Sequence, residues 1–269
     1  MKKTDKFEVG FLGYGRMAQA ISEGLDSRGH IPYARQAASD LPGGEWLKLA
    51  EERRFHQAPD NRALVSLCPV VIVAVKPHQV RAVLEEVRPK AGGRLFISVA
   101  AGLKLADLGA CLPKTAGVVR ALPNLPALVG RGMTLMCAPP GTGRLERARA
   151  IFEAVGEVEE LPEDRFEAGT ALSGSGPAYF FLMMEALIRG AVRLGLTWET
   201  ARRLALETAL GAAETARARP DMNLAALRDQ VTSPGGTTAE ALQVLEKGGF
   251  AGLLAEALQA AAEKGGRLA

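Results

Sequence analysis

The stretch that decides the fold runs from Phe7 to Ala18 and reads F-E-V-G-F-L-G-Y-G-R-M-A. Its apolar first half stops at Gly13 and Gly15, and an apolar stripe at helical spacing follows. A strand, a glycine turn and a helix in this order form the dinucleotide-binding fingerprint. The first glycine permits the tight turn, the second lets the backbone approach a pyrophosphate, and Ala18 keeps the helix close to the strand. Because glycine turns are common, the flanking strand and helix carry this prediction.

Alternating strand and helix patterns extend outward from this turn and predict an α/β fold, with a Rossmann-like doubly wound domain over residues 1–165. From residue 166 to residue 269 we find only helical patterns, which predict an all-α dimerisation and substrate domain. The expected strands after the first are Ile31–Ala34, Val70–Val75, Leu95–Val99, Gly117–Leu122, Thr134–Cys137 and an edge strand at Val158, with a helix over Arg144–Val155.

The second half is expected to open with a loop, Ser173–Pro177, followed by a helix to Leu194. This helix is apolar on most of its faces, which indicates burial, and in so small a domain it indicates packing against another subunit. The further helices are expected over Thr197–Arg219, Asp221–Gln230, Thr237–Glu246 and Phe250–Lys264.

The expected strand Ile31–Ala34 bears on the choice of cofactor. NAD-specific folds place an acidic residue near the end of this strand, where it binds the ribose 2′-hydroxyl. Here the segment continues as Arg35-Gln36, without a carboxylate, and a guanidinium suits a 2′-phosphate. NADPH is therefore expected in preference to NADH, although a solvated surface arginine explains Arg35 equally well.

Two further strands are expected to end at the same edge of the sheet, where open α/β sheets bind ligands. The buried strand Val70–Val75 runs into Lys76-Pro77-His78, and Leu95–Val99 runs into Ala100-Ala101-Gly102. Lys76 is a candidate for packing along the cofactor, and the small residues of the second turn permit a close backbone approach.

A glycine-rich helix start lies near the end of the chain, within V-T-S-P-G-G-T-T-A-E-A-L from Val231 to Leu242. Pro234, Gly235 and Gly236 cannot continue a helix, and a new helix begins at about Thr237 or Thr238. The first amides of such a helix lack intrahelical partners and attract anions. A small carboxylate is the expected ligand, and a capped helix that follows a loop is the alternative.

The composition, net charge and cysteine count of the whole chain exclude several classes of protein. The chain has 269 residues, of which 48% are hydrophobic and 23% charged, as in an ordinary soluble globular protein. A net charge of +3 is too mild to indicate nucleic acid. Three separated cysteines suggest neither disulfides nor a metal site and fit a cytoplasmic compartment. No stretch is expected to reach the length of a membrane span.

Together these motifs resemble those of the pyrroline-5-carboxylate reductase family over nearly the whole chain. The most specific are L-S-G-S-G-P-A-Y and V-T-S-P-G-G-T-T, and they accompany V-G-F-L-G-Y-G-R-M-A, A-V-K-P, V-A-A-G and R-A-L-P-N-L-P. The resemblance implies NAD(P)H-dependent reduction of the C=N bond of 1-pyrroline-5-carboxylate to L-proline, the last step of proline biosynthesis. It also implies a homodimer or a larger assembly of dimers, in which the helical domains of two subunits interlock around the active site.

The resemblance assigns roles residue by residue, although the segment Tyr33–Gly44 follows the family poorly. The expected cofactor-binding residues, with Arg35 added from the argument above, are Leu12, Gly13, Tyr14, Gly15, Arg16, Met17, Arg35, Asn61, Ala74, Val75, Lys76, Pro77, Val99, Ala100 and Ala101. The expected substrate-binding residues are Glu163, Ser175, Gly236, Thr237 and Thr238, and the Thr238 hydroxyl is the expected catalytic group.

Two other functions compete with this interpretation. β-Hydroxyacid dehydrogenases share a Rossmann domain followed by helices, but their chemistry requires a lysine on the first long helix, and Ser173–Arg189 contains none. A non-catalytic nucleotide-sensing dimer is expected to have a degraded substrate loop, whereas the loop at Thr237–Thr238 is intact. The three histidines, His30, His56 and His78, lie in unpromising positions for catalysis.

Overall fold

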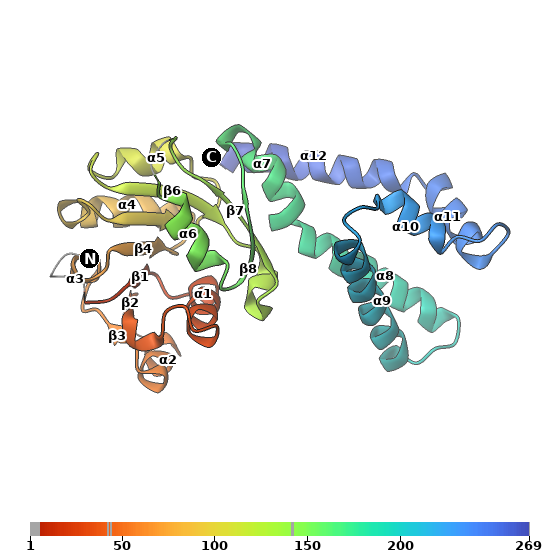
Figure 1. Cartoon of the computed structure of the whole chain (residues 1–269), viewed down its shortest axis with the longest axis horizontal. Coiled ribbons are helices and arrows are strands. Elements are labelled where there is room, and N and C mark those ends of the chain that lie inside the picture. The colour runs from red at the N-terminus through yellow and green to blue at the C-terminus, as the bar shows by residue number, and fades with distance from the viewer. Residues whose placement is uncertain (1–5, 42, 44, 141–142, 269) are drawn as a thin grey trace. The chain divides into compact units, whose positions relative to one another are not determined.

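The computed structural model describes residues 6–41, 43, 45–140 and 143–268 (Figure 1). Among these residues, eight strands form a single sheet in the order β3-β2-β1-β4-β5-β6-β7-β8. The strands are β1 (Val9–Leu12), β2 (Gln36–Ser39), β3 (His56–Gln57), β4 (Val70–Val73), β5 (Leu95–Ser98), β6 (Gly117–Leu122), β7 (Gly132–Cys137) and β8 (Gly156–Glu160).

The first six strands are parallel and follow the order 3-2-1-4-5-6 of dinucleotide-binding sheets. Strand β7 is antiparallel to β6, and β8 is parallel to β7. The helices beside this sheet are α1 (Arg16–Ser27), α2 (Glu45–Arg53), α3 (Asn61–Leu67), α4 (Pro77–Val87), α5 (Leu105–Ala110), α6 (Leu145–Phe152) and α7 (Phe166–Gly169). The predicted doubly wound fold is therefore confirmed.

Two hydrophobic clusters, one on each face, hold the helices on the sheet. Alternate residues of β4 enter opposite clusters, because successive side chains of a strand point to opposite faces. Ile72 lies with Ile21 of α1 in one cluster, and Val71 lies with Leu84 of α4 in the other. The parallel strands are thus buried on both faces, and ligand access is left to the ends of the strands.

The expected strand Ile31–Ala34 is wrong. Tyr33–Arg35 forms a 3₁₀ turn after Pro32, and the strand is Gln36–Ser39. Its residues Ala37 and Ala38 are fully buried, although alanine is a poor strand former. Pairing with β1 on one side and β3 on the other overrides this local preference. The carboxyl end of β2 is therefore Ser39, with Asp40 directly after it.

The expected loop Ser173–Pro177 is also wrong. A π-helical turn, Thr170–Gly174, connects α7 to α8 (Gly176–Arg193). The Ser173 hydroxyl donates to the Gly169 carbonyl oxygen at 3.0 Å, so it satisfies a carbonyl within the helical run. Such π-helical turns occur frequently at functional sites.

Two compact units divide the chain. One comprises Met1–Ser175 with Ala261–Ala269, and the other comprises Gly176–Ala260. These ranges differ from the predicted domains, because the segment up to Ser175 packs with the sheet: Phe166 is fully buried in a cluster with Leu135 and Cys137. The domain boundary at residue 165 stays a prediction.

The second unit is helical throughout, and α8 packs against α9. Its further helices are α9 (Trp198–Ala218), α10 (Leu224–Gln230), α11 (Thr237–Lys247) and most of α12 (Phe250–Leu268). Large apolar side chains of α8 are exposed in the single chain, including Phe180, Phe181 and Leu182. An exposed apolar surface of this kind is typical of a protein–protein interface.

The helical run Glu163–Arg193 is long and apolar enough to cross a membrane by length and composition. The sequence analysis did not expect such a stretch. One helix of this kind is weak support for a membrane span, because apolar helices that pack inside proteins have the same composition.

Candidate active site

The glycine turn lies between β1 and α1 and has the shape that a dinucleotide requires. Gly13 has a φ of +84°, and a Cβ atom at this position would lie 2.9 Å from Val75 Cγ1 and 3.0 Å from Val75 N. A Cβ atom on Gly15 would meet nothing within 4 Å. The turn is therefore packed tightly on its inner side and open on its outer side. This fits a pyrophosphate that approaches the backbone at Gly15.

The N-terminus of α1 strengthens this fit. Gly15 is its N-cap residue, no side chain caps the helix, and its first turn carries no acidic residue. The helix dipole and the free amides therefore favour an anion at this point. The side chains of Leu12 and Tyr14 are fully buried in the core, so only their backbone can take part in binding. Arg16 is exposed and Met17 is half-buried.

Two neighbouring strands end beside this turn. The Ala74 amide donates to the Leu12 carbonyl oxygen at 2.8 Å, and the Val99 amide donates to Val73 at 3.1 Å. The segments Ala74–Pro77 and Val99–Ala101 thus continue from β4 and β5 at the carboxyl edge of the sheet. The Lys76 side chain is exposed, and its amide donates to Gln79 Oε1 at 3.2 Å. The structure therefore brings these predicted cofactor residues to one edge.

A polar cluster marks the carboxyl end of β2. The Ser39 hydroxyl donates to Asn61 Oδ1 at 2.9 Å, and Asn61 Nδ2 donates to Glu86 Oε2 at 2.8 Å. Asp40 Oδ2 accepts a hydrogen bond from the Tyr14 amide of the glycine turn at 2.7 Å. Asn61 was among the predicted cofactor residues, whereas Asp40 was missed because the preceding strand was placed too early.

Arg35 lies at the amino-terminal end of β2, whereas the glycine turn lies at the carboxyl ends of the strands. This position corrects its predicted role. It precedes Gln36, the first residue of β2, which pairs with Val9 at the start of β1. Its Nη1 lies 2.7 Å from Glu8 Oε1. At roughly 3.3 Å per residue, a four-residue strand puts about 13 Å between this position and the glycine turn. Arg35 is therefore too far from the glycine turn to bind a 2′-phosphate there.

Because Arg35 is remote from the turn, Arg35→Ala is expected to leave the affinities for NADH and NADPH unchanged. The loss of its exposed ion pair with Glu8 should lower the free energy of unfolding by no more than about 1 kcal/mol. Calorimetric titration with each cofactor checks the first expectation. A selective loss of NADPH affinity would restore the original assignment.

Glu163 is held by a buried arginine that the sequence analysis missed. Arg120 of β6 is 3% exposed, and its Nη2 lies 2.6 Å from Glu167 Oε1. Its Nη1 lies 3.6 Å from Glu163 Oε1, which also accepts a hydrogen bond from the Leu105 amide at 2.6 Å. The guanidinium carbon lies 4.1 Å from the centroid of the Phe166 ring. Two carboxylates and an aromatic face thus compensate a charge that would be costly to bury alone.

Cys137 lies in the same region and is excluded as a nucleophile. Burial, and next the negative charge of Glu163, raise the pKa of its thiol to about 12. At neutral pH the thiol is therefore fully protonated, and the thiol form is a poor nucleophile.

In the second unit, α11 begins at Thr237, as predicted, and Gly236 is its N-cap residue. Gly235 has a φ of +67°, and a Cβ atom on Gly236 would collide with Ser233 Oγ. The left-handed backbone of Gly235 thus favours glycine, and the Ser233 side chain occupies the space beside Gly236. No side chain caps this helix end, so its first amides remain available to an anion. Ser175, the last residue of the first unit's main segment, follows the π-helical turn.

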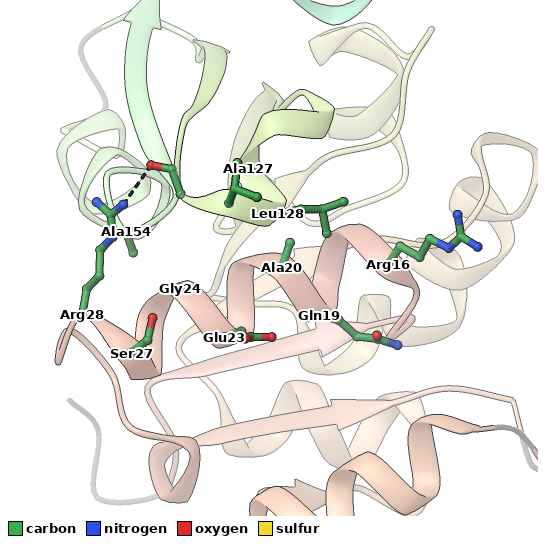
Figure 2. Close-up of a pocket in the computed structure, with 12 residues that line it drawn as sticks. Arg16, Gln19, Ala20, Glu23, Gly24, Ser27, Arg28, Ala127, Leu128 and Ala154 are labelled. Carbon is green, nitrogen blue, oxygen red and sulfur yellow. Dashed lines mark hydrogen bonds between the residues drawn. The ribbon is translucent and has the colours of Figure 1, made fainter. Parts of the chain in front are cut away.

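A groove of about 290 Å³ runs along the outer side of α1 (Figure 2). Residues 127–130 lie on its opposite wall, and Arg28 closes one end by donating to the Gly130 carbonyl oxygen at 2.8 Å. Arg16, at the start of α1, lines the groove and also borders the glycine turn. Arg16 is the only predicted site residue among those that line the groove.

Two family models match the two halves of the chain. Residues 163–268 match the family model described as pyrroline-5-carboxylate reductase dimerisation. Residues 8–102 match the model described as NADP oxidoreductase, coenzyme F420-dependent. The pyrroline-5-carboxylate reductase of Pseudomonas aeruginosa is 40% identical over 265 residues, which is 97% of this chain and 96% of that protein.

Two solved structures are similar over nearly their whole length. The pyrroline-5-carboxylate reductase of Coxiella burnetii has a TM-score of 0.91 at 38% identity, and the match covers 98% of this chain and 99% of that one. The Plasmodium falciparum pyrroline carboxylate reductase with NADP bound has a TM-score of 0.88 at 29% identity, with coverage of 98% and 99%. The chain belongs to the pyrroline-5-carboxylate reductase family.

Proposed function

We propose that this chain reduces the C=N bond of 1-pyrroline-5-carboxylate to L-proline, with Thr238 at the reacting centre and NAD(P)H on the glycine turn. The observation that carries the proposal is the uncapped start of α11. Its first turn combines free backbone amides with the hydroxyls of Thr237 and Thr238. The substrate has a fixed carboxylate, for which such a helix start is a ready receptor.

The reaction requires little of the protein beyond orienting the imine against the cofactor. The reduced nicotinamide supplies the hydride, and a protonated imine is already a strong electrophile. The Thr237 and Thr238 amides hold the carboxylate, which fixes the ring, and the Thr238 hydroxyl oxygen accepts a hydrogen bond from the protonated ring nitrogen. No side chain caps α11, which leaves the Thr238 hydroxyl free for this role.

Glu163 and the cofactor residues complete the proposed site. Arg120 and the Leu105 amide hold the Glu163 carboxylate in one place, so Arg120 is proposed as a positioning residue. The cofactor contacts are proposed at the glycine turn, at Asn61 and along the ends of β4 and β5. The Plasmodium falciparum relative is a solved structure with NADP bound, which supports a nicotinamide dinucleotide in this fold.

The assembly is proposed to be a homodimer or a larger oligomer built from dimers. Support comes from the dimerisation model over residues 163–268 and from the exposed apolar side chains of α8. A cytoplasmic location is proposed because Cys111 and Cys137 are buried thiols outside any disulfide, which suits a reducing compartment. L-Proline and its cyclic imine are the proposed small-molecule partners. The proposal includes no nucleic-acid partner and no membrane partner.

A substrate comparison tests the reaction class. The purified protein should oxidise NADPH or NADH when it is given the cyclic imino acid, and it should leave 3-hydroxyacids untouched when it is given NADP⁺ or NAD⁺. The second expectation follows because α8 carries no lysine for hydroxyacid chemistry. Turnover of a hydroxyacid with none of the imine would overturn the proposal.

A further inference from the structure

Asp40 occupies the position from which dinucleotide-binding folds read the adenosine ribose. It directly follows Ser39, the last residue of β2, whose carbonyl oxygen accepts a hydrogen bond from the Gly13 amide at 2.9 Å. An acidic residue at the end of this strand binds the ribose 2′-hydroxyl in NAD-specific folds, whereas an arginine nearby accommodates the 2′-phosphate of NADP. The residue directly after the observed strand β2 is thus the carboxylate Asp40, whereas the residue directly after the expected strand Ile31–Ala34 was Arg35.

The Asp40 carboxylate is fixed in place and still has capacity to accept. Oδ2 accepts from the Tyr14 amide at 2.7 Å and Oδ1 from the Leu41 amide at 2.7 Å. These two hydrogen bonds hold the group beside the glycine turn. An ionised carboxylate has about four acceptor sites. Each oxygen therefore retains a lone pair for a ribose hydroxyl.

Among the described residues, Asp40 forms no ion pair within 4.0 Å. Residues 41–47 read L-P-G-G-E-W-L, without lysine or arginine, and Lys48 follows them with an exposed side chain. Arg35 is engaged with Glu8 at the opposite edge, and Arg62 directs its Nε to the Glu86 carbonyl oxygen at 3.0 Å. A dianionic phosphate beside Asp40 would therefore meet the like charge of this carboxylate.

We propose that Asp40 binds the ribose 2′-hydroxyl of the cofactor and disfavours a 2′-phosphate, so that this chain prefers NADH to NADPH. The inference rests on the proposed function only in that the ligand is a nicotinamide dinucleotide. Asp40 is a specificity-determining residue in this account, and it takes no part in the reduction of the imine.

Binding of the oxidised cofactors to the whole protein tests this directly. By calorimetric titration, the dissociation constant of NADP⁺ should exceed that of NAD⁺ by at least about tenfold, the effect of one hydrogen bond to a charged group. Asp40→Asn keeps the shape and one acceptor, for the Tyr14 amide, but removes the charge and the acceptor of the Leu41 amide. It should lower this ratio by roughly ten- to a hundredfold.

Glu157→Gln is the matched control, because it removes the same charge from β8, at the far edge of the sheet. It should leave the ratio unchanged. Wild-type protein that binds NADP⁺ as tightly as NAD⁺, or a ratio that Asp40→Asn does not move, would overturn the proposal. Should Asp40→Asn fail to fold, the wild-type ratio still decides the matter. Reduction of the imine is measured separately, so preference for NAD⁺ without imine reduction would contradict the proposed function and leave the role of Asp40 standing.

Discussion

Replacing Thr238 with alanine is expected to lower kcat/KM for the imine by roughly ten- to a hundredfold. One hydrogen bond to a charged group contributes about 1.5–3 kcal/mol, and each 1.36 kcal/mol is about tenfold in rate. Thr238→Ser keeps the hydroxyl and should retain much of the activity. Steady-state kinetics with the imine varied at saturating cofactor measure the loss.

The stability of the variant separates this role from that of a helix cap. No side chain caps α11 in the wild-type structure, so Thr238→Ala should change the melting temperature little. Thr115→Ala, which removes an exposed hydroxyl just before β6, is the matched control and should change neither kinetics nor stability. Wild-type kinetics combined with a melting temperature several degrees lower would make Thr238 a structural residue and leave the proton to water.

A charge on the apolar surface of α8 is expected to abolish assembly. Phe181 and Leu182 are 52% and 68% exposed in the single chain, and we expect a partner subunit to cover them. An uncompensated buried charge costs about 3–5 kcal/mol, which raises the dissociation constant of the dimer by more than about a hundredfold. Phe181→Glu or Leu182→Glu should therefore yield poorly assembled, inactive protein.

Sedimentation velocity, with activity measured on the same samples, checks this expectation. Val129→Glu is the matched control, because it introduces the same charge at an apolar residue of the first unit that is 76% exposed. This variant should assemble and remain active. Wild-type protein that sediments as an active monomer would contradict the account of α8.

The elements that the sequence predicted well are those in which local pattern and tertiary packing agree. Strand β6 was predicted with its observed bounds, Gly117–Leu122, and β4 was recognised from its run of β-branched residues. Strand β2 was misplaced, because its sequence Q-A-A-S has no strand preference of its own. Its pairing with both neighbouring strands, which no local pattern reports, decides its position.

Some residues of the candidate site were likewise predictable from local sequence, and others were not. Gly13 was predictable because only glycine readily adopts the left-handed conformation of the turn. Arg120 was not, since its partner Glu167 lies 47 residues further along the chain, and neither residue is unusual by itself. Asp40 depends on the Tyr14 amide, 26 residues earlier, and on the true end of β2. Long-range pairing decides these contacts, and a single sequence does not display it.

The central claim is that hydride passes from the nicotinamide to the imine carbon of 1-pyrroline-5-carboxylate on this protein. The most direct test supplies NADH that carries deuterium at both hydrogen positions of nicotinamide C4 and analyses the product by mass spectrometry and NMR. The account predicts L-proline with one deuterium at the ring carbon that was doubly bonded to nitrogen. Cofactor oxidation without proline, or proline without deuterium at that carbon, would contradict it.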